Sequence, residues 1–184
     1  MQNNSIRQLK NGLIDDNFFI IDSYNLELIK SHMYGFSISK EGILTNNYFK
    51  LIGRYDVPEP QGVYILIRKE GNKIILNQDY QGNFGLYIYE SQDKDYFAIS
   101  NSFLLLEEYL LDKQKISINI DYANNFVISP VCSSSIYETM INEITKVPSN
   151  KMLVINIKNK TFNYYFINYK ENTIPFESKK DWKL

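Results

Sequence analysis

Three short stretches of the sequence carry residue types that could bind a ligand or take part in a reaction. Asp79 and Gly82 lie in "LNQDYQGNFGLYIYE", between two runs of strand-forming residues. Cys132 lies in "SPVCSSSIYE", and the only histidine, His32, lies one hundred residues earlier. A loop carboxylate can hold an ammonium group, and a cysteine becomes a nucleophile when a base or an N-terminal amine generates its thiolate. The sequence therefore offers one candidate ligand loop and one candidate nucleophile.

Each of these residues also has an interpretation without chemistry. An aspartate that binds turn backbone and a glycine with positive φ make a tight turn, so Asp79-x-x-Gly82 is also typical of a purely structural loop. Cys132 is typical of a small buried hydrophobic residue, although a pair with His32 stays open as an alternative. No Cys, His and Asp cluster has the spacing of metal ligands, so we expect no metal site. The glycine patterns of nucleotide-binding loops are missing too.

Composition narrows the class of protein. The 184 residues are 44% hydrophobic and 22% charged, which predicts a single globular domain over residues 1–184. The net charge is -1 and lysines and arginines are dispersed, so we expect neither nucleic acid nor an anionic membrane as a partner. There is one cysteine, no signal pattern and no apolar run near the ~20 residues that cross a bilayer. We expect a cytoplasmic location.

The elements that must position these residues are mostly strands. Short β-type runs occur in "NFFIIDSY" and "MYGFSIS", and "NKMLVINIKNKTFNYYFINY" predicts a hairpin around Lys-Asn-Lys. The clearest pattern is "GVYILIRKEGNKIILNQDYQGNFGLYIYESQDKDYFAIS", which predicts four strands in an antiparallel meander. The stretch "EGILTNNYFKLIGRYDVPEPQ" is the least regular, and its prolines favour a loop.

Helices are expected at four places. The stretch "NSFLLLEEYLL" begins with the capping types Asn101 and Ser102 and continues as an apolar-rich helix. "ISINIDYANNFV" gives way to a helix, "SSSIYETMINEI" predicts one or two helical turns, and residues 1–16 predict one weak turn. Strands outnumber helices and can pair with their sequence neighbours. This indicates an α+β fold of antiparallel sheets with a few helices packed on them.

The order of these features resembles the N-terminal glutaminase-type domain of asparagine synthetases. The matching stretches lie between Gln61 and Phe166, in "PQGVYILIRKEGNKIILNQDYQGNFGLYIY", "YFAISNSFLLLEEYL" and "YETMINEITKVPSNKMLVINIKNKTFNYYF". The resemblance implies an N-terminal-nucleophile-hydrolase-like fold, with two antiparallel sheets face to face between flanking helices. It further implies that Asp79 matches the aspartate that holds the amino group of glutamine in active members, and Gly82 the turn glycine. Ser100-Asn101 stands where the family usually has Ser-Glu.

The chain departs from the active family pattern at both chemical parts of the site. Active members expose an N-terminal cysteine whose own amine is the base, whereas this sequence begins Met1-Gln2-Asn3. The family's Asn-Gly oxyanion stretch is missing, since the corresponding segment reads "TNNYFKLIGRYD". The resemblance therefore implies an inactive glutaminase-like scaffold with no catalytic residue. The residues that match its substrate site are vestigial: Asp79, Gly82, Ser100 and Asn101.

The same resemblance implies a longer protein and a partner domain. We expect this chain to be the N-terminal part of an asparagine-synthetase-like, ATP-dependent amide-forming protein, followed by an ATP-pyrophosphatase-type synthetase domain. ATP and Mg would belong to that following domain, and no cofactor to this chain. Two alternatives stay open: an active amidohydrolase that uses Cys132, and a freestanding β-rich module that binds sugar or peptide. A row of exposed aromatic residues on one sheet face would favour the module, and buried ones a double-sheet core.

Overall fold

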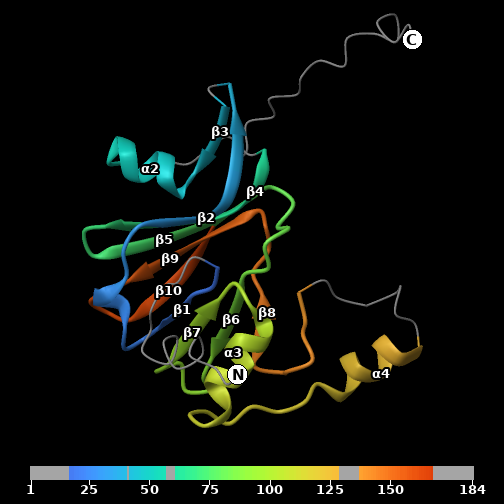
Figure 1. The fold of residues 1–184 in the computed structure, drawn as a ribbon. Helices are drawn as coiled ribbons and strands as arrows, with labels where there is room; N and C mark the ends of the chain where they lie inside the picture. Colours follow the sequence, from blue (N-terminus) through green and yellow to red (C-terminus); the bar gives the residue numbers. More distant parts are fainter. Residues whose placement is uncertain (1–16, 41, 57–60, 129–136, 168–184) are drawn as a thin grey trace, which may run out of the picture.

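The computed structural model describes residues 17–40, 42–56, 61–128 and 137–167, whose strands form two antiparallel sheets (Figure 1). The four-stranded sheet has the order β1 (Ile20–Asp22), β7 (Phe97–Ser100), β6 (Tyr87–Glu90), β8 (Ile144–Lys146). The six-stranded sheet has the order β10 (Thr161–Phe166), β9 (Lys151–Asn156), β5 (Lys73–Gln78), β4 (Gly62–Glu70), β2 (His32–Ser39), β3 (Gly42–Thr45). The helical elements are η1 (Leu26–Leu28), α2 (Asn46–Ile52), α3 (Phe103–Leu111) and α4 (Ile120–Ile128).

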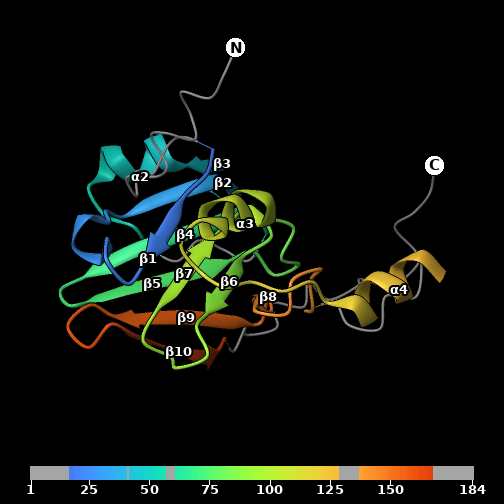
Figure 2. The same cartoon turned by 90° about the horizontal axis from the view of Figure 1, so that it is seen from below.

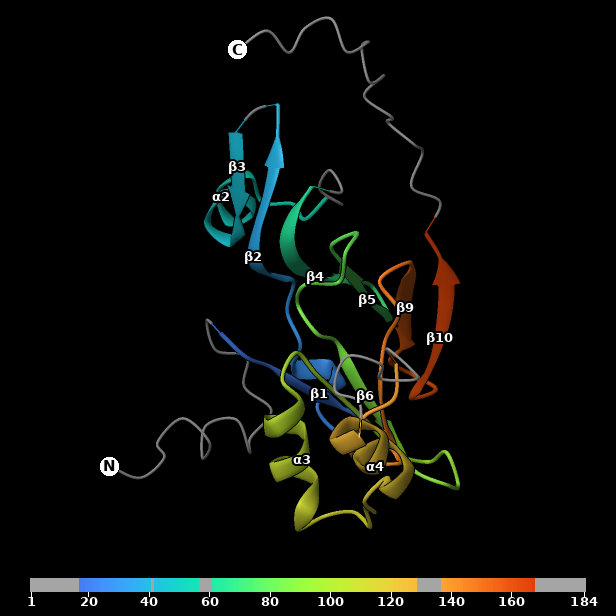
Figure 3. The same ribbon diagram turned by 90° about the vertical axis from the view of Figure 1, so that its right-hand side faces the viewer.

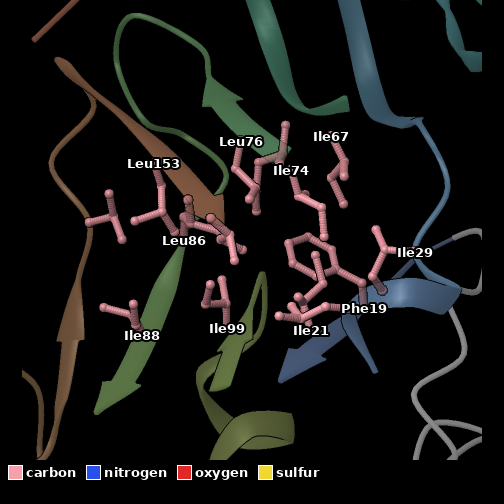
Figure 4. Packing of buried hydrophobic residues seen from close by; sticks show 14 of the residues in the cluster. Phe19, Ile21, Ile29, Ile67, Ile74, Leu76, Leu86, Ile88, Ile99 and Leu153 are labelled. Atoms are coloured by element: carbon pink, nitrogen blue, oxygen red, sulfur yellow. The ribbon is translucent and has the colours of Figure 1, made fainter. Parts of the chain in front are cut away.

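The main core lies between the two sheets. Ile67 and Leu76 of the six-stranded sheet belong to one buried cluster with Ile21 and Ile99 of the four-stranded sheet. Figure 4 shows these aliphatic side chains pointing toward one another from the two sheets. Removal of this apolar surface from water is the main force that holds the sheets face to face.

Helices cover the outer faces of both sheets. Phe49 of α2 packs with Tyr64 and Leu66 on the outside of the six-stranded sheet, and Leu106 and Leu110 of α3 pack on the outside of the four-stranded sheet. Figure 2 shows α2 and α3 with the strands of the two sheets. The layers are thus helix, sheet, sheet, helix, which confirms the predicted α+β class with two antiparallel sheets. Consecutive residues of β4 are buried because both of its faces are covered.

Several predicted elements are present at their predicted places. The β4–β5 hairpin turns at Gly71, whose φ is +57°, and β9 and β10 form the expected final hairpin. Helix α3 is capped by Ser102, whose Oγ accepts a hydrogen bond from the Leu105 backbone at 3.3 Å. Helix α4 follows the alternating stretch, as predicted.

The predicted four-stranded meander is wrong at its centre. Strand β5 pairs with β4 and β9, whereas β6 pairs with β7 and β8. Residues 79–86, here called the crossover loop, therefore carry the chain from one sheet to the other and do not close a hairpin. Instead of pairing with each other, β5 pairs with β9 and β6 pairs with β8, both of which come much later in the chain.

The segment predicted as a loop before residue 62 contains β3 and α2. Helix α2 has no side-chain N-cap, which is why the sequence gives it no clear start, but it ends at Gly53 in the left-handed conformation with φ of +71°. Tertiary packing of Phe49 stabilises it. The helical turns predicted in "SSSIYETMINEI" are not found over residues 137–143, which precede β8 without a helix. The serines of that stretch and the turn predicted in residues 1–16 lie outside the described residues.

Candidate functional site

Asp79 is the first residue of the crossover loop, and its carboxylate organises that loop. Its Oδ1 accepts hydrogen bonds from the backbone of Gln81 at 3.1 Å, from the backbone of Asn83 at 3.2 Å and from Asn83 Nδ2 at 3.3 Å. The Asp79 backbone donates to the Tyr64 carbonyl at 3.0 Å and accepts from the Gly82 N–H at 3.0 Å. The bond to Tyr64 ties the start of the loop to β4, and the other four bonds bring the loop into one compact turn.

The Asp79 side chain is closed to solvent. Its exposed fraction is 0%, and its Oδ2 has no hydrogen-bond partner among the described residues. A buried carboxylate oxygen without a donor is costly, so the bonds at Oδ1 must offset much of the desolvation of the group. The Asp79 carboxylate therefore stabilises the conformation of the crossover loop.

Gly82 allows the second half of the loop to approach a distant segment closely. Its φ is +64°, and a β-carbon there would lie 3.0 Å from Ser149 Cβ. The preceding strand residue, Gln78, donates through Nε2 to the carbonyls of Val147 and Pro148, both at 3.0 Å. The crossover loop is therefore fastened to residues 147–149, which lead into β9.

Ser100 and Asn101 form a second group, at the end of β7. The buried Ser100 Oγ accepts from the Ser102 N–H at 3.0 Å, next to the start of α3. Asn101 Oδ1 accepts from the Phe19 backbone at 3.1 Å, and its Nδ2 donates to the Asn17 carbonyl at 2.9 Å. This pair ties the segment before β1 to the strand beside it. In the described part of the chain, no hydrogen bond joins this group to the Asp79 turn.

The remaining candidates from the sequence do not add to this site. Cys132 lies outside the described residues, so its pairing with His32 stays untested. His32 lies at the start of β2, where its Nδ1 is 3.3 Å from Nδ2 of Asn46 and its ring is 4.5 Å from that of Tyr34. Among the described residues, no group of three His, Cys, Asp or Glu side chains could hold a metal ion.

The structure reveals a buried polar cluster around Asp22 that the sequence analysis missed. Asp22 Oδ1 accepts from the backbone of Tyr24 at 2.9 Å and of Asn25 at 3.0 Å. Its Oδ2 accepts from the hydroxyls of Tyr96, at 3.3 Å, and Tyr109. The cluster joins β1, the residue before β7 and helix α3. The one available signal was a lone aspartate in the apolar run "FFIIDSY".

Both tyrosines of this cluster are held in their neutral form. Burial, and after it the negative charge of Asp22, raises the pKa of Tyr96 far above its ordinary value of 10.0. Burial, and after it the hydrogen bond to Asp22, raises the pKa of Tyr109 in the same direction. Neutral hydroxyls can keep donating to the carboxylate, and its four acceptor bonds leave it satisfied. The arrangement is suited to stability and offers no free reactive group.

Comparisons with protein-family models and with curated proteins find no match for this chain. In the part of the chain that the structure describes, no helix combines the length and apolar character needed to span a membrane.

Proposed function

We propose that this chain is a catalytically inactive, glutaminase-like scaffold domain of an asparagine-synthetase-related, ATP-dependent amide-forming protein. The observation that carries the proposal is the state of Asp79. Its side chain is fully buried, and its Oδ1 is occupied by N–H groups of its own loop. A substrate amino group would need an accessible carboxylate oxygen, and Asp79 offers none. In this proposal the loop resembles that of the family in sequence but serves only as a connection between the sheets.

The layered architecture supports the same proposal. Two antiparallel sheets lie face to face, with α2 and α3 on their outer sides, and this is the arrangement that the resemblance implies. The N-terminal-nucleophile-hydrolase-like fold, the vestigial roles of Ser100 and Asn101 and a cytoplasmic location are parts of this proposal.

Helix α4 supports the presence of a neighbouring domain. None of its residues is buried, and the side chains of Val127 and Ile128 are each 81% exposed. Exposed apolar side chains on a helix that the described residues leave uncovered are typical of a surface that another domain covers. In this proposal the ATP-pyrophosphatase-type domain that follows in the chain covers helix α4, and that domain would hold ATP and Mg.

The sugar- or peptide-binding module is the weaker alternative. Aromatic residues in the middle of the sheets, such as Tyr34, Tyr64 and Phe97, are buried, which favours a double-sheet core. Tyr164 and Phe166 are exposed on one face of β10 and so favour the module, but they lie on a single strand at the edge of its sheet. The active hydrolase that uses Cys132 stays an alternative, and no contact among the described residues supports it.

Two assays test the proposal. The purified chain should release no ammonia or glutamate from glutamine above the blank. Release that Cys132→Ala abolishes would contradict inactivity and favour the hydrolase. The natural polypeptide, precipitated from its source cells with an antibody to this chain, should catalyse ATP–pyrophosphate exchange that depends on a carboxylate substrate. Natural protein without exchange activity would contradict the synthetase assignment.

A further inference from the structure

Strand β10 presents an open edge to solvent. The Ile167 backbone donates to the Asn150 carbonyl at 2.9 Å, one position beyond the last pair of the β9–β10 ladder. Bonding residues alternate in an antiparallel pair, so residues 161, 163 and 165 bond to β9. The N–H and C=O groups of Phe162, Tyr164 and Phe166 therefore point away from β9. Among the described residues, nothing bonds to these outward groups, and Figure 3 shows β10 at the margin of its sheet.

The side chains of the same three residues form an aromatic row on the core-facing side of β10. The register pairs Phe162 with Ile155 and Tyr164 with Leu153, and both aliphatic partners are buried in the core between the sheets. Phe162 packs against this core and lies 5.3 Å from the Phe97 ring. Exposure then rises along the strand, to 39% at Tyr164 and 74% at Phe166. The row therefore runs out of the core into solvent.

The features that usually prevent edge strands from pairing are missing here. Residues 161–167 read "TFNYYFI", without a charge, a proline or a glycine. Opposite charges do flank the middle of the strand. Lys151 Nζ lies 5.4 Å from the centroid of the Tyr164 ring, while burial and then the charge of Glu90 raise the pKa of Tyr164 to about 12.

We propose that β10 pairs antiparallel with β10 of a second copy of this chain, about a two-fold axis at Tyr164. Tyr164 then faces Tyr164 of the second copy, and Phe162 faces Phe166 of the second copy. Each of these pairs exchanges two backbone hydrogen bonds, because all three residues present outward N–H and C=O groups. Each hydrogen-bonded cross-strand pair is aromatic, whereas the pairs between them join Asn163 with Tyr165 of the second copy, and the contact is isologous and closed. The six-stranded sheets of two chains become one continuous sheet.

A second copy suits this edge better than an unrelated peptide. The outward residues are aromatic at all three positions and are symmetric about Tyr164, so the strand is its own complement. This inference does not depend on the proposed function, since an inactive scaffold and an active hydrolase would present the same edge.

Sedimentation velocity over micromolar concentrations tests the pairing. The parent chain should associate to a dimer, and Tyr164→Pro should be monomeric while its circular dichroism stays unchanged. Proline there removes the outward N–H without breaking a bond to β9, and it also removes the Tyr164 ring that contacts Phe162. The control Tyr165→Ser changes a side chain on the opposite face and should remain dimeric. A parent that is monomeric throughout, or a folded Tyr164→Pro that still dimerises, would overturn the proposal.

Disulfide trapping tests the register. In a Cys132→Ser background, Tyr164→Cys should cross-link on oxidation, since facing hydrogen-bonded residues have Cα atoms about 5.5 Å apart, within disulfide range. Phe162→Cys alone should not cross-link, because it faces position 166 of the second copy. The double variant with Phe162→Cys and Phe166→Cys should cross-link again. Equal cross-linking of the two single variants, or none by Tyr164→Cys, would refute the two-fold pairing.

Discussion

Gly82 and Ser149 approach each other so closely that a β-carbon on the glycine would lie 3.0 Å from the serine Cβ. Gly82 also has φ of +64°, a conformation that branched residues rarely adopt. The loop between the sheets and the segment before β9 thus meet at a position where any side chain would be strained by the positive φ and would crowd Ser149. This contact makes the crossover loop sensitive to a single methyl group.

Gly82→Val should lower the free energy of unfolding by about 1–3 kcal/mol, from backbone strain and from crowding against Ser149. Gly71→Val is the matched control, because Gly71 has φ of +57° but no atom within 4 Å of a β-carbon. It should cost less, since only the strain applies. Urea unfolding of both variants measures the difference. Equal losses would show that the contact with Ser149 does not constrain the loop.

Asp79→Asn should cost about 1 kcal/mol or less, because the amide oxygen can keep accepting from the loop backbone. Asp79→Ala should cost more, since it leaves the N–H groups of Gln81 and Asn83 without their acceptor. Urea unfolding of the two variants separates these effects. A large loss in Asp79→Asn would mean that the negative charge itself stabilises the loop.

Millimolar glutamine should leave the melting temperature of the parent chain unchanged, because the Asp79 carboxylate is closed to solvent. A ligand that bound the folded chain alone would raise it. Thermal melts of the parent and of Asp79→Asn, with and without glutamine, measure this. A shift in the parent that disappears in the variant would show that the vestigial site still binds the amino acid.

Alkaline pH should destabilise the fold through Tyr96 and Tyr109. The pKa of each is higher in the folded chain than the ordinary 10.0, so above pH 10 the unfolded chain loses protons that the folded chain retains. The stabilisation is fully present below pH 10 and is lost as pH rises further. Each tyrosine should add a slope of up to about 1.4 kcal/mol per pH unit.

Urea unfolding between neutral pH and pH 11 measures that slope for the parent, for Tyr109→Phe and for an exposed control, Tyr80→Phe. Tyr109→Phe should flatten the slope and should also cost about 1.5–3 kcal/mol at neutral pH, because the charged acceptor Asp22 loses the hydrogen bond that the Tyr109 hydroxyl donates. The same slope in Tyr109→Phe as in Tyr80→Phe would show that Tyr109 does not contribute to it.

Helix α4 should tolerate polar substitution. Val127→Glu and Ile128→Glu should each change the free energy of unfolding by about 0.5 kcal/mol or less, because neither side chain is buried. Leu110→Ala in the covered helix α3 should cost about 2–5 kcal/mol. Thermal and urea unfolding of the three variants measure these changes in the free energy of unfolding. A loss at Val127 as large as that at Leu110 would show that α4 packs on the rest of the chain.

Local signals in the sequence were enough for the strands that pair within a few residues and for α3. Gly71 between two apolar runs predicts the β4–β5 hairpin, and Ser102 before an apolar run predicts the start of α3. The Asp79-x-x-Gly82 pattern likewise predicts the turn that is observed, because the bonds of Asp79 to the backbone are local. Helix α2 could not be found this way, since it has no capping bond and depends on the packing of Phe49 against the six-stranded sheet.

The sequence by itself determined where the chain turns and which residues are apolar enough to be buried. Tertiary structure alone decided which sheet each strand joins, because pairing of β5 with β9 and of β6 with β8 rests on contacts between distant residues. For the same reason, only the fold shows that Asp79 is sealed inside a crossover and that Asp22 meets Tyr96 and Tyr109. Local propensity acts over a few residues, whereas burial and hydrogen-bond satisfaction depend on neighbours that the folded chain brings together.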